Sequence, residues 1–177
     1  MRKTGLLPVA RSDSRVLILG SLPGDASLAA QEYYAHPRNH FWPLLSSIIG
    51  RNLVTMEYRE RIDALNSARI ALWDVIGEAH RPGSLDSQIR FAQVNDLREF
   101  VSGLPDLQAV AFNGKKSAAL AANAFDSASL DVVGLPSSSP ANTLDFEAKR
   151  AIWAVLTKYL AVGNNNGNAH ILRHQSR

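Results

Sequence analysis

Short aliphatic runs alternate with helical patterns along most of this chain, and this alternation limits the folds that are open to it. Residues 16–19 are four consecutive aliphatic residues followed by Gly20, which is typical of a strand buried on both faces. Three more apolar runs predict strands, and the stretches between them predict helices. Such alternation favours βαβ crossovers and a mostly parallel sheet covered on both faces. The sequence therefore predicts an α/β fold.

The apolar patterns also predict where each element lies. At 177 residues the chain is expected to form a single domain, over residues 1–162, with no internal repeat. Residues 163–177 are poor in apolar side chains and rich in asparagine, so we expect a flexible C-terminal tail. The predicted strands cover residues 15–20, 69–76, 107–112 and 130–135, and the predicted helices cover residues 40–49, 56–68, 95–103, 114–125 and 144–160.

Composition excludes several classes of protein. The chain is 46% apolar and 20% charged, as in ordinary soluble domains, and no apolar run approaches the roughly 20 residues that cross a bilayer. We therefore expect a cytoplasmic protein with no membrane partner. The chain has no cysteine, which excludes disulfides, thiolate zinc sites and iron–sulfur clusters, and its histidines lack metal-ligand spacing. No metal or cofactor is predicted. A net charge of +3 is compatible with a polyanion but indicates little alone.

Ligands of parallel sheets bind beyond the carboxyl ends of the strands, so the loops that follow the predicted strands are the candidate sites. These loops cover residues 20–24, 77–86, 113–116 and 136–142. The first, Gly20-Ser21-Leu22-Pro23-Gly24, matches neither a dinucleotide fingerprint nor a phosphate-binding P-loop. It is either a tight turn or a backbone segment that faces a ligand closely, which glycine permits.

A cluster of aromatic residues at positions 33–42 suits a pocket that holds a flat ring. We expect the backbone ahead of the His-Pro turn to be extended, so that the ring of Tyr34 projects into the cleft. Core packing at the start of a helix is the simplest interpretation of Phe41 and Trp42. Asn39 is either a helix N-cap or an amide that orients water, and an amide is a poor base near neutral pH.

Two later loops offer groups that suit phosphate. Lys115 and Lys116 follow Asn113-Gly114 between a strand and a helix, as a solvated first turn or as phosphate ligands at a helix N-terminus. Residues 135–142 form either a polar linker or a rigid phosphate-binding loop, and the two prolines argue against free flexibility. The residues of this loop with candidate roles are Ser137, Ser138, Ser139, Pro140 and Asn142.

These loops, in this order, resemble the uracil-DNA glycosylase superfamily, and within it the hypoxanthine-DNA (deoxyinosine) glycosylases. Residues 20–23 resemble the first signature motif, residues 34–42 resemble the H-P-x-N-x-F-W segment, and residues 135–142 resemble the second signature motif. The resemblance spans about residues 16–160. It implies a three-layer α/β/α sandwich with a central four-stranded parallel sheet.

The resemblance also implies an activity and roles for particular residues. It implies a monomeric enzyme that flips a deaminated base out of double-stranded DNA and hydrolyses its N-glycosidic bond. Hypoxanthine is the first candidate base, and uracil and xanthine are further candidates. Most branches place an acidic or amide residue where this chain has Leu22, so the catalytic role falls to Asn39. The base pocket would comprise Gly20, Ser21, Leu22, Pro23, Tyr34, Phe41 and Asn113, and the DNA-binding residues would be Lys115, Lys116, Ser137, Ser138, Ser139, Pro140 and Asn142.

Two other functions remain open at the level of sequence. Because Leu22 can activate no water, the chain could be a lesion-binding protein with little or no catalysis. The arrangement of loops at strand ends also permits a nucleotide- or phosphoester-binding protein of the α/β class. Steep salt dependence of duplex binding would separate DNA-binding functions from the latter.

Overall fold

A four-stranded parallel sheet forms the centre of the molecule, whose computed structural model describes residues 1–125 and 128–160. The order of its strands is β3-β2-β6-β7, so β2, the first of these four in sequence, lies inside the sheet. Every residue of β2 and β6 is buried, which explains their almost entirely apolar sequences. The strands are β2 (Val16–Gly20), β3 (Ile70–Asp74), β6 (Ala109–Asn113) and β7 (Asp131–Leu135).

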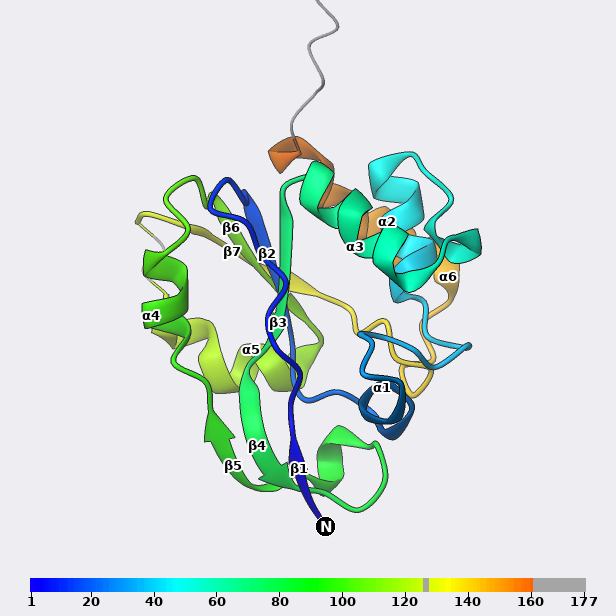
Figure 1. The fold of residues 1–177 in the computed structure, drawn as a ribbon, viewed down its shortest axis with the longest axis vertical. Helices are drawn as coiled ribbons and strands as arrows, with labels where there is room; N and C mark the ends of the chain where they lie inside the picture. Colours follow the sequence, from blue (N-terminus) through cyan, green and yellow to red (C-terminus); the bar gives the residue numbers. More distant parts are fainter. Residues whose placement is uncertain (126–127, 161–177) are drawn as a thin grey trace, which may run out of the picture.

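Helices cover both faces of this sheet, as Figure 1 shows. Side chains of β2 alternate between two cores: Val16 and Ile18 pack on one face, and Leu17 and Leu19 pack on the other. This confirms the predicted α/β/α sandwich. The first face carries α2 (Phe41–Ile49), α3 (Tyr58–Ser67) and α6 (Phe146–Trp153), and the second carries α4 (Leu97–Ser102) and α5 (Lys115–Ala121).

A second sheet, which the sequence did not predict, extends from one end of the first (Figure 1). It has three antiparallel strands in the order β1-β4-β5: β1 (Arg2–Thr4), β4 (Ile76–His80) and β5 (Arg90–Val94). The predicted strand 69–76 in fact ends at Asp74, and β4 occupies part of the predicted loop 77–86. Each residue of β5 is exposed, so no alternation of apolar and polar residues marks it as a strand.

Side-chain caps define the starts of several helices. Asp96 caps α4 by accepting the N–H of Glu99 at 3.0 Å. Asp145 caps α6 through Ala148 N–H at 2.8 Å. The predicted helix 144–160 is shorter than expected, because α6 gives way at Ala154 to a 3-10 segment. The remaining short elements are α1 (Asp25–Ala30), η1 (Leu53–Thr55), η2 (Asp86–Gln88), η3 (Ala122–Ala124) and η4 (Ala154–Tyr159).

Within the part of the chain that the structure describes, no helix has the length and apolar content needed to cross a membrane. The predicted tail, residues 163–177, lies outside the described residues.

Candidate active site

A cavity of about 310 Å³ lies at the carboxyl ends of the central strands. The last residues of three strands, Gly20 of β2, Asp74 of β3 and Asn113 of β6, line it together. The structure thus brings the predicted loops together at one edge of the sheet. Twelve of the predicted site residues line the cavity: Gly20, Ser21, Leu22, Pro23, Tyr34, Asn39, Asn113, Ser137, Ser138, Ser139, Pro140 and Asn142.

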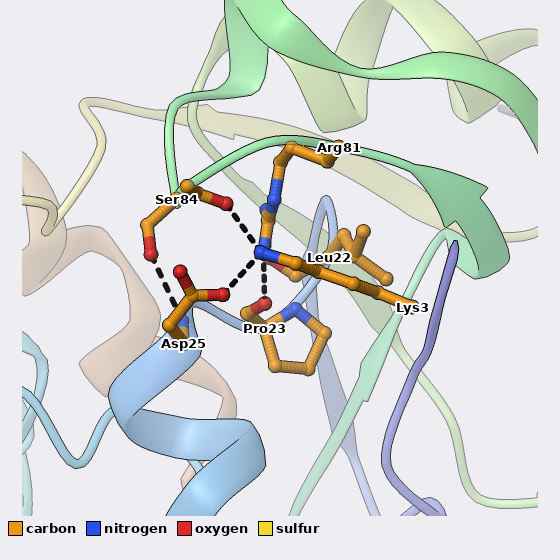
Figure 2. A network of polar contacts seen from close by, with 7 residues as sticks. Lys3, Leu22, Pro23, Asp25, Arg81 and Ser84 are labelled. Carbon is orange, nitrogen blue, oxygen red and sulfur yellow. Dashed lines mark hydrogen bonds and ion pairs between the residues drawn. The ribbon is translucent and has the colours of Figure 1, made fainter. Parts of the chain in front are cut away.

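Two cations, Lys3 of β1 and Arg81 directly after β4, contact the first signature loop and the residue that follows it (Figure 2). Arg81 is fully buried and donates to the carbonyl groups of Leu22, at 3.1 Å, and Pro23. Lys3 of β1 donates to the Asp25 carboxylate and the Gly83 carbonyl. Because a buried arginine binds two carbonyl groups of this loop, and Lys3 binds Asp25 directly after it, the loop is more than a simple tight turn.

Tyr34 lines the cavity with Phe41 stacked behind it. The two ring centroids are 3.7 Å apart and the ring planes differ by 14°. Phe41 is fully buried and does not line the cavity, so it supports the Tyr34 ring and does not face the cavity itself. The expected extended backbone is wrong, because Tyr34 has φ 55° and lies in the left-handed region. Trp42 packs in the core, as predicted, and donates to the Tyr33 carbonyl at 3.1 Å.

Asn113 forms hydrogen bonds both to Tyr34 and to the second signature loop, residues 135–142. Its amide nitrogen donates to Tyr34 Oη at 3.0 Å and to Ser138 Oγ at 2.9 Å. Its carbonyl oxygen accepts the backbone N–H of Ser138 at 2.8 Å. These three hydrogen bonds orient Asn113 and fix the Tyr34 hydroxyl beside it. Burial raises the pKa of Tyr34, so its hydroxyl keeps its proton.

Asn39 lies one residue before the N-cap position of α2, which is His40, so the predicted N-cap role is wrong. Its side-chain oxygen instead accepts the backbone N–H of Phe41, two residues on, at 3.0 Å. The residue also lines the cavity and is half-buried. This local hydrogen bond fixes the orientation of the amide, whose N–H groups are its remaining donors.

The second signature loop, residues 135–142, is anchored to α6 and to the start of α2. Lys149 of α6 is fully buried and donates to the carbonyl groups of Asn142, at 3.0 Å, and Ser139, at 3.4 Å. Trp153 donates to the Pro136 carbonyl at 2.9 Å, and His40 N–H donates to the Ser138 carbonyl at 2.9 Å. Burial lowers the pKa of Lys149. Residues 136–142 therefore form a held loop rather than a linker.

Lys115 and Lys116 do not line the cavity. They are the first two residues of α5 and directly follow Gly114. The backbone of Gly114 packs closely against the second signature loop, because a Cβ added at Gly114 would lie 3.0 Å from Ser137 Cβ. Lys115 is exposed and Lys116 half-exposed. They follow closely in sequence after Asn113, which lines the cavity.

Residues 8–157 match the family model described as the uracil DNA glycosylase superfamily. The chain belongs to this superfamily. It is 39% identical over 158 residues to a protein of Methanosarcina barkeri named hypoxanthine DNA glycosylase, which covers 87% of this chain and 97% of that relative. A protein of the same name from Methanosarcina acetivorans is 35% identical, with 90% of this chain and 100% of the relative covered. The enzyme is therefore a DNA N-glycosylase, and DNA is its substrate.

A solved structure supports the same assignment for this glycosylase. It is the solution NMR structure of a candidate uracil DNA glycosylase from Methanosarcina acetivorans, which is 35% identical and superimposes with a TM-score of 0.81. The match covers 89% of this chain and 98% of that one. The resemblance of the three motifs is thus confirmed at the level of family and fold.

Four charged residues shape the glycosylase cavity without having been assigned roles from sequence, although Arg81 and Asp86 belong to the predicted site loop 77–86. Asp74 and Asp86 line it, and Ser21 donates to Asp86 at 2.7 Å. Arg81 and Lys149 hold its two signature loops. Asp74 had a visible signal, since it is a carboxylate at the end of an apolar strand, where such sites form. Over residues 1–125 and 128–160, no group of three or more metal-ligating side chains comes together.

Proposed function

We propose that this glycosylase excises hypoxanthine from deoxyinosine in double-stranded DNA, acting as a monomer on a base flipped out of the helix. The observation that carries the proposal is the 39% identity, over nearly the whole length, to a protein named hypoxanthine DNA glycosylase. Uracil and xanthine are further candidate bases, since they also arise by deamination and carry an oxo group.

The cavity suits one extruded base. Its volume of about 310 Å³ is at the small end for ligand pockets, and no base could enter it while stacked in a duplex. Flipping costs a few kcal/mol and least at a mismatch, which favours damaged pairs. In this proposal Tyr34 stacks on the flipped base, with Phe41 supporting it from behind. Backbone groups of residues 21–23 and Asn113 read the base edge.

The second loop and the lysines of α5 would hold the DNA strand. The hydroxyl and N–H groups of Ser137, Ser138 and Ser139 would contact the flanking phosphates, together with Lys115 and Lys116. The tip of the loop, residues 139–142, would enter the duplex and fill the gap left by the base. Lys149 supports this tip, because it holds the carbonyl groups at both ends of it.

Asn39 is the proposed catalytic residue. Cleavage of the glycosidic bond proceeds with cation character on the sugar, so the attacking water needs positioning more than deprotonation. An amide suits that task, and the hydrogen bond that its oxygen accepts from Phe41 N–H leaves its own N–H groups to hold a water near the anomeric carbon. Leu22 is 5% exposed and packs into the core below the cavity, so it leaves this role to another residue.

A panel of duplex oligonucleotides tests the proposal. Each duplex carries deoxyinosine, deoxyuridine, deoxyxanthosine or an undamaged base. The base released is measured by mass spectrometry, and binding of the duplex to the protein is measured by gel shift. We expect release of hypoxanthine and none from the undamaged duplex. Tight binding to a lesion-containing duplex without release of any base would contradict the enzymatic function and indicate a lesion-binding protein.

A further inference from the structure

Asp74 is a buried carboxylic acid that lines the cavity and has one oxygen without a hydrogen-bond partner in the described part of the chain. It is the last residue of β3, it lines the cavity, and it is 3% exposed. Its Oδ2 atom is buried and has no hydrogen-bond partner among the residues that the structure describes. A buried polar atom without a partner costs free energy, so this oxygen is placed for a group that the free enzyme lacks.

The charged groups around Asp74 do not pair with it. From the segments after β4, Arg81 donates through its two terminal nitrogens to the carbonyl groups of Leu22 and Pro23, and its buried Nε has no partner among the described residues. Asp86 is a second carboxylate, which accepts from Ser21. The neighbouring groups of β2, β6 and the aromatic segment are uncharged: Gly20, Asn113 and Tyr34. Burial and the repulsion from Asp86 outweigh the attraction of Arg81 and raise the pKa of Asp74 to about 8.

A neutral carboxyl group offers what an oxo-purine edge requires. It places one O–H donor beside one C=O acceptor, and hypoxanthine places its O6 acceptor beside its N1–H donor. When the C1′–N9 bond breaks, the electron pair stays on the purine, and negative charge spreads to O6. A neutral donor stabilises that charge, whereas an ionised carboxylate at the same place would repel it.

We propose that Asp74 acts as a neutral carboxylic acid that contacts the flipped base, donating a hydrogen bond to its oxo group and accepting one from the adjacent ring N–H. This inference rests on the proposed excision of hypoxanthine. In the reaction Asp74 keeps its proton. Water oxygen bonds to C1′ and releases a proton to solvent, and the departing purine anion takes up a proton from solvent.

The test combines two variants with a pH profile of the full-length enzyme. Single-turnover release of hypoxanthine is measured from pH 6 to pH 9.5, with enzyme in excess over a deoxyinosine duplex. The parent rate should fall about tenfold per pH unit once Asp74 ionises, above a pH of about 8. Asp74→Asn keeps a donor and an acceptor without a charge, so it should stay within about tenfold of the parent at pH 7 and lack this fall. Asp74→Ala should lose about 100-fold or more.

Each outcome decides the inference. Circular dichroism and thermal melting first establish that each variant is folded; if Asp74→Ala is not, the Asp74→Asn profile decides alone. A folded Asp74→Asn that is inactive, or that shows the same alkaline fall as the parent, would overturn it. So would an Asp74→Ala variant as fast as the parent. If the parent itself releases no hypoxanthine at any pH, the proposed function fails; if the parent is active and the variants do not respond as stated, only the role of Asp74 fails.

Discussion

Gly20 and Asp74 touch so closely at the floor of the cavity that no side chain fits between them. A Cβ added at Gly20 would lie 2.6 Å from Asp74 Oδ1 and 3.0 Å from Tyr34 Oη. Neither neighbour can give way easily, since Asp74 ends a buried strand and Tyr34 is bonded to Asn113 and stacked on Phe41. The glycine of the first signature loop is therefore required by the packing of two other site residues.

Gly20→Ala should accordingly damage both stability and activity. Overpacking of this kind costs about 1–3 kcal/mol of unfolding free energy, and displacement of Asp74 or Tyr34 should slow base release. Gly24→Ala is the matched control for stability, because a Cβ there would meet Ser84 Oγ at an ordinary 3.4 Å and Gly24 has φ −69°. Urea unfolding of the two variants measures the difference. Equal stability of the two variants would contradict the contact.

Asn39→Ser separates the local hydrogen bond from the chemistry. A serine hydroxyl can accept the N–H of Phe41 two residues on, so the stability should stay within about 0.5 kcal/mol of the parent. Serine has no amide, so the single-turnover rate of base release should fall on the order of 100-fold through loss of water positioning. Asn39→Ala should show the same rate loss and an additional loss of about 1 kcal/mol of unfolding free energy, because the hydrogen bond is removed. A serine variant with the parent rate would remove Asn39 from the mechanism.

The buried carboxyl of Asp74 also makes stability depend on pH. The unfolded chain ionises this group near the ordinary aspartate pKa of 3.8, whereas the folded protein keeps it protonated up to about pH 8. Between these values the unfolded state binds fewer protons, so this group lowers stability as pH rises by up to about 1.4 kcal/mol per unit, and the loss levels off above about pH 8.

Asp74→Asn removes that titration. The gain in unfolding free energy of the variant over the parent should therefore grow between pH 5 and pH 8 and then stay constant. Urea titrations at several pH values measure it. A difference between the two proteins that does not change with pH would show that Asp74 is ionised in the folded protein.

The lysines at the start of α5 should contribute mainly to nonspecific electrostatic binding. Lys115→Ala and Lys116→Ala should each lower the slope of log K against log salt concentration by about 1, if each contacts one phosphate. Arg51→Ala is the control, because Arg51 is exposed and follows the far end of α2 from the cavity. Fluorescence anisotropy with a labelled duplex measures the slopes. An unchanged slope in both lysine variants would show that neither lysine contacts a phosphate.

The sequence predicted the parts of the fold that have a regular pattern of apolar residues. The two inner strands, β2 and β6, are apolar runs because both of their faces are buried, and this pattern can be recognised without knowledge of the neighbouring elements. The small sheet carries no such pattern, since β1 has three residues and β5 is exposed throughout. The motif residues were predicted from their loops at strand ends and from their resemblance to a family.

Buried polar partnerships were beyond prediction from one sequence. Lys149 and Arg81 look like ordinary surface cations in the sequence, and only the packed chain shows them bonded to carbonyl groups of the two signature loops. The support of Tyr34 by Phe41 likewise depends on a left-handed backbone at Tyr34, which residue preferences argue against. Such features arise from tertiary contacts rather than from local sequence.

Release of free hypoxanthine from a deoxyinosine duplex, counted per molecule of enzyme, tests the central claim most directly. With duplex in excess, the proposed function predicts more than one hypoxanthine released per enzyme, an equal number of abasic sites, and no base released from the same duplex with adenine at that position. Saturable binding to the deoxyinosine duplex with no free hypoxanthine and no abasic site would contradict it.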